Sequence, residues 1–171
     1  MKTVVITGSA RGLGFEMAKE FRKNNYNVVI SDILMEELYK AEEKLKSIET
    51  NAKVLSVKCD VTKEEDLENL KNETVKYFEN IDIWINNAGV NQEMVPIWQV
   101  ETKDIDKLID IDLKGAMIGS KVAVNQMIKQ GFGQIYGIEG YGSNDAMMTG
   151  LSVYGTSKRR LVPTCREEKE N

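Results

Sequence analysis

The stretch Thr7-Gly8-Ser9-Ala10-Arg11-Gly12-Leu13-Gly14 decides the fold, because it joins an apolar run at residues 2–7 to a helical pattern. The apolar run predicts a buried strand, and the spacing of Leu13, Met17 and Phe21 predicts the helix. Glycines at such a junction allow a tight turn and bring free amide groups at the helix N-terminus close to a pyrophosphate. A glycine-rich loop can also be a tight turn without a ligand, so other parts of the sequence must show whether this loop binds a pyrophosphate.

Strands and helices continue to alternate along the chain. We expect further strands at 27–31, 53–58, 81–85 and 133–138, and helices at 34–48, 62–78 and 102–130, with another from Ser152. Thr62 and Glu65 form a capping box for the third helix. Strands that alternate with helices of this length indicate parallel, right-handed βαβ units. The prediction is an α/β fold, a three-layer doubly wound parallel sheet with about five strands.

The composition narrows the classes of function. A net charge of -4 over 171 residues argues against a nucleic-acid or anionic-membrane surface. We expect a cytoplasmic protein, because the first apolar run is too short for a signal peptide and no run is long enough to span a membrane. Histidine is absent, and Cys59 and Cys165 are far apart. Imidazole-based mechanisms are therefore excluded, and no metal site is expected.

Asp32 follows the second predicted strand, where a carboxylate can accept hydrogen bonds from ribose hydroxyls and repel a 2′-phosphate. This position favours NAD over NADP as the cofactor. Asp32 could instead cap the helix that begins near Leu34. Arg11 could reach a 2′-phosphate, so NADP stays possible. No Gly-Lys-Ser/Thr follows the glycines, which excludes a nucleoside-triphosphate loop.

Three further motifs follow the glycine loop in order. They are Asp60-Val61 after the third strand, Asn86-Asn87-Ala88-Gly89 after the fourth, and Tyr154-Gly155-Thr156-Ser157-Lys158 on the last helix. With them, the chain from Lys2 to Lys158 resembles the short-chain dehydrogenase/reductase family. The resemblance implies a Rossmann-like NAD(P)-dependent oxidoreductase that acts on a small-molecule alcohol or carbonyl compound. It also implies a homo-oligomer for the full-length family form.

The resemblance also implies which residues contact the cofactor. The residues implied are Gly8, Ser9, Arg11, Gly12, Leu13, Gly14, Asp32, Asp60, Val61, Asn87, Ala88, Gly89, Tyr154 and Lys158. Asp60 and Val61 would border the adenine, and Asn87 with the backbone after it would line the nicotinamide side. The alternative for Asn86 and Asn87 is a turn stabilised by side-chain-to-backbone bonds, which could hold for Asn86 at the same time.

Tyr154 and Lys158 are four residues apart and share one face of the predicted helix. The ammonium of Lys158 is expected to favour phenolate over phenol and so to lower the pKa of Tyr154. Such a pair is also common on a solvated helix face. In the family that the chain resembles, the tyrosine is the general acid/base and the lysine also binds the nicotinamide ribose.

The chain departs from the family pattern at two catalytic positions. Glu139 and Gly140 occupy the usual positions of the catalytic serine, and Ser143 is the nearest serine that could fill its role. Asp112 stands where the family has an asparagine that holds a water of the proton relay. Asp112 could hold that water, or it could be a plain surface carboxylate. The Glu-Gly-x-Gly-Ser pattern at 139–143 weakly resembles the chlorophyll b reductase branch.

The end of the chain differs as well. Pro163 is expected to break the last helix, which leaves residues 1–162 as a single dinucleotide-binding domain and 163–171 as a charged tail that we expect to be disordered. Since the family continues through further strands, we expect a C-terminally truncated form.

Besides an active oxidoreductase, two alternatives stay open. One is an inactive nucleotide-binding relic or regulatory module. The other is an S-adenosylmethionine-dependent methyltransferase, which leaves the Asn-Asn-Ala-Gly and Tyr/Lys motifs unexplained.

Overall fold

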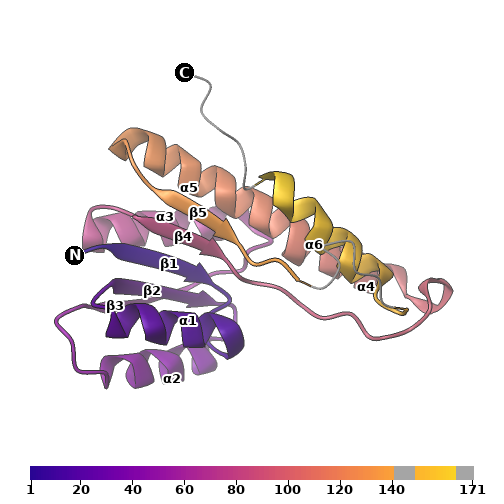
Figure 1. Ribbon diagram of the computed structural model, residues 1–171, viewed down its shortest axis with the longest axis horizontal. Coiled ribbons are helices and arrows are strands. Elements are labelled where there is room, and N and C mark those ends of the chain that lie inside the picture. Colours follow the sequence, from indigo (N-terminus) through magenta and orange to yellow (C-terminus); the bar gives the residue numbers. More distant parts are fainter. Residues whose placement is uncertain (141–148, 165–171) are drawn as a thin grey trace.

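The computed structural model describes residues 1–140 and 149–164, the last six of these through their backbone alone. Its centre is a parallel sheet with the strand order β3-β2-β1-β4-β5 (Figure 1). The strands are β1 (Thr3–Thr7), β2 (Asn27–Asp32), β3 (Val54–Lys58), β4 (Ile83–Asn86) and β5 (Gln134–Gly137). The predicted doubly wound α/β fold with five strands is confirmed.

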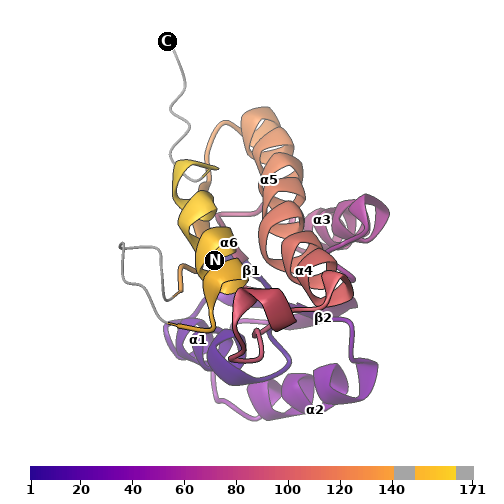
Figure 2. The ribbon, with the colours of Figure 1, turned by 90° about the vertical axis from the view of Figure 1, so that its right-hand side faces the viewer.

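Helices cover both faces of this sheet and make it the middle of three layers (Figures 1 and 2). The helices α1 (Gly12–Lys23) and α2 (Met35–Lys46) lie on one face. The helices α3 (Glu64–Phe78) and α5 (Ala116–Gln130) lie on the other, where α6 (Ser152–Thr164) packs beside α5 and α4 (Thr102–Leu108). A short 3-10 turn, η1 (Ile97–Gln99), precedes α4.

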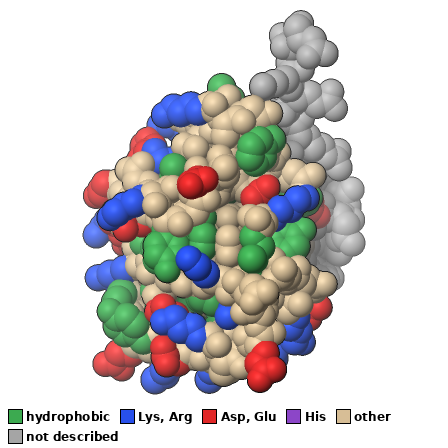
Figure 3. All heavy atoms as spheres, turned by 90° about the vertical axis from the view of Figure 1, so that its left-hand side faces the viewer, with side chains coloured by type: hydrophobic (Ala, Val, Ile, Leu, Met, Phe, Trp, Pro, Cys, Tyr) green, Lys and Arg blue, Asp and Glu red, His purple; other side chains and the backbone are tan. Residues whose placement is uncertain are grey.

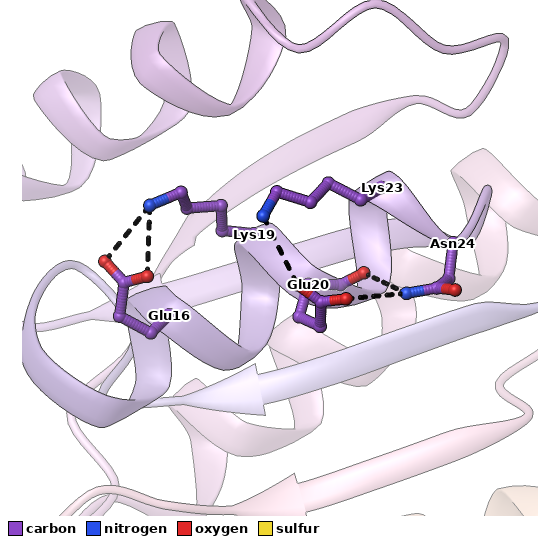
Figure 4. A network of polar contacts seen from close by, with 5 residues as sticks. All are labelled: Glu16, Lys19, Glu20, Lys23 and Asn24. Carbon is purple, nitrogen blue, oxygen red and sulfur yellow. Dashed lines mark hydrogen bonds and ion pairs between the residues drawn. The ribbon is translucent and has the colours of Figure 1, made fainter.

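The alternation of side chains along the strands builds two cores. In β1, Val4 and Ile6 point to the layer of α1 and α2, and Val5 points to the layer of α3 and α5; all three are fully buried. Every residue of β1 is buried, as expected for a central parallel strand covered on both faces. The outer face of α1 carries charged pairs instead, Lys19 with Glu16 and Lys23 with Glu20 (Figure 4).

The order of the strands positions the functional site. The chain winds outward from β1 in one direction through β2 and β3, and in the other through β4 and β5. A crevice therefore opens between β1 and β4 at the carboxyl ends of the strands, where doubly wound sheets bind ligands. Figure 2 faces these ends. Figure 3 shows the opposite side of the molecule, where acidic and basic side chains are interspersed.

Three sequence-based expectations about the helices are wrong. The helix predicted at 102–130 is interrupted by a π-helical segment, η2 (Ile109–Gly115). The capping box does not form, because the Thr62 hydroxyl donates to Asp60 Oδ1 at 2.7 Å and α3 begins only at Glu64. Helix α6 runs one residue past Pro163. A proline in a last turn removes only one hydrogen bond, so it does not break the helix interior.

None of the helices within residues 1–140 and 149–164 is long and apolar enough to cross a membrane.

Candidate functional site

A cavity of about 710 Å³ lies at the carboxyl ends of the strands and reaches from the glycine loop to Tyr154 and Lys158. Its size is within the range of small-molecule and cofactor sites, roughly 300–1,000 Å³. Its lining comes from the segments that follow all five strands and from the helical segments α4, η2 and α6. The motifs that are far apart in the sequence therefore meet around one space.

The glycine loop is held against the end of β4. Gly8 has a φ of +61°, and a Cβ atom there would lie 2.6 Å from the Cα of Ala88, so only glycine fits. The side-chain amide of Asn87 donates to the backbone oxygens of Thr7 and Gly8 at 2.9 and 2.8 Å. Gly14 leaves the space that this amide occupies. The loop thus has one shape, which turns the N-terminus of α1 toward the cavity.

The loop residues that line this end of the cavity are Gly8, Arg11, Gly12, Leu13 and Gly14. Ser9 is not among the lining residues, although it was predicted with them. It is fully buried, donates to the backbone oxygen of Ile6 at 2.7 Å and accepts from Ser31 N–H at 3.0 Å. Its side chain joins the loop to β2, and a contact with the cofactor stays a prediction.

Asp32 lines the cavity and also braces the turn after β2. Its Oδ1 accepts from Leu34 N–H at 3.1 Å, and its Oδ2 accepts from Ala10 N–H at 3.4 Å. Since α2 begins only at Met35, this is a turn contact rather than a helix cap. The carboxylate is held beside the glycine loop, and its contact with an adenosine ribose stays a prediction.

Asp60 and Val61 line the same cavity, and their place beside the adenine stays a prediction. Asp60 Oδ1 accepts from the backbone and the hydroxyl of Thr62, which fixes its orientation. Cys59 beside it also lines the cavity, although no motif indicated it. Burial raises the pKa of the Cys59 thiol to about 12, and the charges of Asp66 and Asp60 add to this shift.

The residues of the Asn-Asn-Ala-Gly motif have two different positions in the structure. Asn87, Ala88 and Gly89 line the cavity, whereas Asn86 is buried behind it. Asn86 accepts from Trp84 Nε1 and donates to Ser120 Oγ, both at 2.9 Å. The idea that Asn86 stabilises a turn through backbone bonds is therefore wrong, because its side chain ties β4 to α5.

Tyr154, Lys158 and Asp112 meet at the other end of the cavity. Lys158 Nζ lies 3.0 Å from Asp112 Oδ2 and 5.6 Å from the centre of the Tyr154 ring. Lys158 is 6% exposed and Asp112 is 1% exposed. A solvated helix face and a plain surface carboxylate are both excluded by this burial. Asp112 Oδ1 also accepts from Val90 N–H at 2.8 Å.

The pKa of Tyr154 is raised above its usual value, chiefly by burial and further by the negative charge of Asp112. The expected lowering of this pKa by Lys158 is therefore wrong for this arrangement. The physical reason is that the ammonium of Lys158 is paired with a carboxylate, so that it offers little net charge to the phenol.

Of the two residues at the expected positions of the catalytic serine, Glu139 and Gly140, the second lies against Tyr154. A Cβ atom there would lie well under 3.0 Å from the Tyr154 hydroxyl, so the backbone of residue 140 lies directly against the phenol. The neighbouring Glu139 lines the cavity and is exposed. Ser143, the predicted substitute for the serine, lies outside the described residues.

Sequence reasoning missed several lining residues: Ile33, Leu34, Cys59, Val90, Asn91, Lys107, Ile111 and Ile138. Most of these come directly after or shortly after a strand. The four positions after each observed strand include five of these eight residues, because the carboxyl ends of parallel strands face the crevice. Lys107 and Ile111 come from the helical wall and had no such signal.

The family model for the short chain dehydrogenase family matches residues 2–167. The chain belongs to the short-chain dehydrogenase family. It is 35% identical to an Arabidopsis thaliana protein described as a probable chlorophyll(ide) b reductase, chloroplastic, over 92% of this chain and 35% of that protein. It is 36% identical to a diacetyl reductase [(S)-acetoin forming] of Staphylococcus epidermidis, over 75% of this chain and 49% of that protein.

Among solved structures, the chain is similar to an NAD+-bound xylitol dehydrogenase, with a TM-score of 0.89 and 26% identity. The match covers 95% of this chain and 61% of that protein. The chain thus spans about a third to a half of the length of these curated relatives and somewhat more of the solved structure.

Proposed function

We propose that this chain forms the cofactor-binding and proton-transferring part of an oxidoreductase that moves a hydride between a nicotinamide cofactor and a carbinol or ketone. One observation carries the proposal: Tyr154 and Lys158 line the same cavity as the glycine loop and Asp32. Membership of the short-chain dehydrogenase family supports it. A methyltransferase would leave the Tyr/Lys end of this cavity without a role.

The described residues fit a dinucleotide. The N-terminus of α1 directs unpaired amide groups toward the cavity, which suits the pyrophosphate. Asp32 accepts from the ribose hydroxyls next to the adenine. When bound, the nicotinamide supplies or accepts the hydride. Tyr154 donates a proton to the carbonyl oxygen during reduction and takes it back during oxidation.

We further propose that NAD is preferred over NADP. The Asp32 carboxylate is fixed by two backbone amides, so it cannot turn away from a 2′-phosphate. Arg11 also lines the cavity, and its charge acts on Glu37 of α2 as well. It contributes, after Lys40, to the lowering of the pKa of Glu37. The fixed anion therefore outweighs the cation near the ribose.

The proposal is tested with the purified 171-residue chain. NADH oxidation is followed with diacetyl and a panel of ketones, and NAD binding is measured by calorimetry. Tyr154→Phe removes only the ionisable hydroxyl, so we expect turnover to fall about 100- to 10,000-fold while NAD affinity is unchanged. Tyr77→Phe, an exposed tyrosine on α3, is the matched control and should change neither. Full turnover in Tyr154→Phe would remove the tyrosine from the mechanism.

A second candidate is a nucleotide-binding module without turnover. Two features favour it: Glu139 and Gly140 stand at the expected positions of the catalytic serine, and Asp112 pairs with the lysine. In this case the chain binds NAD, Asp32→Asn weakens the binding, and no carbonyl compound is reduced. The same calorimetric and kinetic measurements therefore separate the two candidates.

Three broader predictions accompany the proposal. Residues 1–162 are proposed to form one domain with a tail at 163–171, which limited proteolysis tests. The homo-oligomer implied for the full-length family form is tested by analytical ultracentrifugation. The cytoplasmic location also stays a prediction, since the Arabidopsis relative is described as chloroplastic.

A further inference from the structure

Lys158 and Asp112 carry opposite charges, and both are buried beside Tyr154. A tyrosine that acts as a general acid/base is expected to have only the positive charge of the lysine beside it. We propose that Asp112 is a positioning residue that withholds the charge of Lys158 from the Tyr154 hydroxyl, so that Tyr154 remains a protonated donor throughout the neutral pH range. This inference rests on the proton-transfer role proposed above, and it concerns how that role is tuned.

The carboxylate of Asp112 is held in place from two sides. Asp112 lies in the middle of the π-helical segment η2, and its Oδ1 accepts from Val90 N–H at 2.8 Å. Its Oδ2 faces Lys158 Nζ at 3.0 Å, and no group among the described residues makes a well-aligned hydrogen bond to it. The contact is thus an ion pair rather than a directed hydrogen bond. Gly89 leaves room for it, since a Cβ there would crowd both partners at 3.3–3.4 Å.

Because Lys158 and Asp112 are buried, the net charge of the pair determines how strongly it affects the ionisation of Tyr154. Solvent screens buried charges far less than exposed ones, so a lone ammonium 5.6 Å from the ring of Tyr154 would stabilise a phenolate strongly. A carboxylate in contact with the same ammonium cancels most of that field. The cancellation leaves burial as the main influence on the phenol, and burial favours the neutral form.

The other charged groups around α6 do not take over the effect of Lys158 and Asp112 on Tyr154. Lys107 from α4 and Glu139 after β5 line the same cavity and carry opposite charges. Glu93, on the segment before α4, is exposed. Lys121 on α5 is bonded to α3 at 2.7 Å. The raised pKa of Tyr154, which has burial as its larger cause and Asp112 as its second, agrees with this account.

The test is a spectroscopic titration of tyrosine ionisation, which requires neither substrate nor turnover. The phenolate absorbance is followed against pH in the unmodified chain and in Asp112→Asn, and the contribution of Tyr154 is isolated by subtracting the same curves measured with Tyr154→Phe. Asparagine keeps an oxygen for Val90 N–H but loses the charge. We expect the transition of Tyr154 to move to lower pH in Asp112→Asn.

The matched control is Asp110→Asn, the same chemical change in the same segment. The side chain of Asp110 is 48% exposed and pairs with Lys114 at 3.4 Å, so the transition of Tyr154 should not move. Lys158→Gln is the second variant and should move the transition the opposite way, to higher pH, because the carboxylate is then unopposed. A Tyr154 transition that stays in place in both Asp112→Asn and Lys158→Gln, or that moves equally in Asp110→Asn, overturns the inference.

The pH dependence of turnover separates this inference from the proposed function. If Asp112→Asn moves the ionisation of Tyr154 but no variant reduces a carbonyl compound, the tuning stands and the catalytic proposal fails. If turnover depends on Tyr154 but Asp112→Asn leaves the ionisation of Tyr154 unchanged, the catalytic proposal stands and the inference about Asp112 fails. With both correct, the breaks in the rate profiles move to lower pH in Asp112→Asn, in step with the spectroscopic curve.

Discussion

The backbone of Gly140 lies directly against the hydroxyl of Tyr154, so close that a Cβ atom at position 140 would overlap the phenol oxygen. The residue type at position 140 therefore decides where that oxygen can lie. In this chain glycine, the smallest residue, stands at one of the two positions at which the resemblance places a catalytic serine.

We predict that Gly140→Ala reduces turnover while NAD binding is retained. The methyl group must displace the Tyr154 hydroxyl, and a misplacement of about 1 Å can cost on the order of 100-fold in rate. Steady-state kinetics with a carbonyl substrate, together with calorimetric titration of NAD, measure the two effects separately. An unchanged rate would show that the hydroxyl does not need its present position.

We predict that Asp32→Asn weakens NAD binding and strengthens NADP binding. Hydrogen bonds to a charged group contribute about 1.5–3 kcal/mol, so the loss in NAD affinity should be on the order of 10- to 100-fold. The removed charge also ends the repulsion of a 2′-phosphate. Calorimetry with both cofactors at one salt concentration tests this. Asp104→Asn, an exposed change on α4, is the control. Equal cofactor preferences in Asp32→Asn and the unmodified chain would refute the role of Asp32.

We predict that Cys59 makes stability fall at alkaline pH. The pKa of this thiol rises from 9.0 when unfolded to about 12 when folded, so its contribution is complete below pH 9 and is lost as the pH rises from 9 to about 12. Urea unfolding of the unmodified chain and of Cys59→Ala should show a shallower decline in the variant across this window. Parallel declines would mean that the buried thiol ionises as freely as an exposed one.

A related prediction concerns the reactivity of the same thiol. In a Cys165→Ser variant, Cys59 should resist a thiol reagent at pH 8 until the protein is unfolded, because the thiolate is the reactive form and burial suppresses it. Labelling is followed by absorbance in increasing urea. Rapid labelling without urea would show that this end of the cavity opens.

We predict that Tyr136→Lys reduces self-association. Strand β5 lies at one edge of the sheet and, among the described residues, pairs only with β4. Tyr136 on this strand is 48% exposed, and a charged side chain on an edge strand discourages pairing with another chain. Light scattering is compared with that of Tyr39→Lys, an exposed change on α2. Equal scattering from both variants would show that β5 does not mediate association.

The fold was predictable because its signals are local. The apolar run before Gly8 and the repeat of strands and helices fix a parallel sheet whatever the side chains later contact. The glycine loop and Asp32 were predictable for the same reason, since each belongs to one junction. The pKa of Tyr154 was not predictable, because it depends on Asp112. Asp112 lies 42 positions earlier and reaches the site only through tertiary packing. No spacing along the chain reports such a meeting.

The π-helical segment η2 gives the chain a freedom that an uninterrupted helix would not allow. A π turn holds more residues than an α turn, so the residues of η2 are out of step with the buried face of α5, where Ala123 and Met127 pack against α3 and the sheet. The segment η2 can therefore present Ile111 and Asp112 to the cavity while α5 keeps its own buried face against the core. An asparagine or an aspartate at position 112 changes the acidity of the site, while the layers beneath it remain as they are.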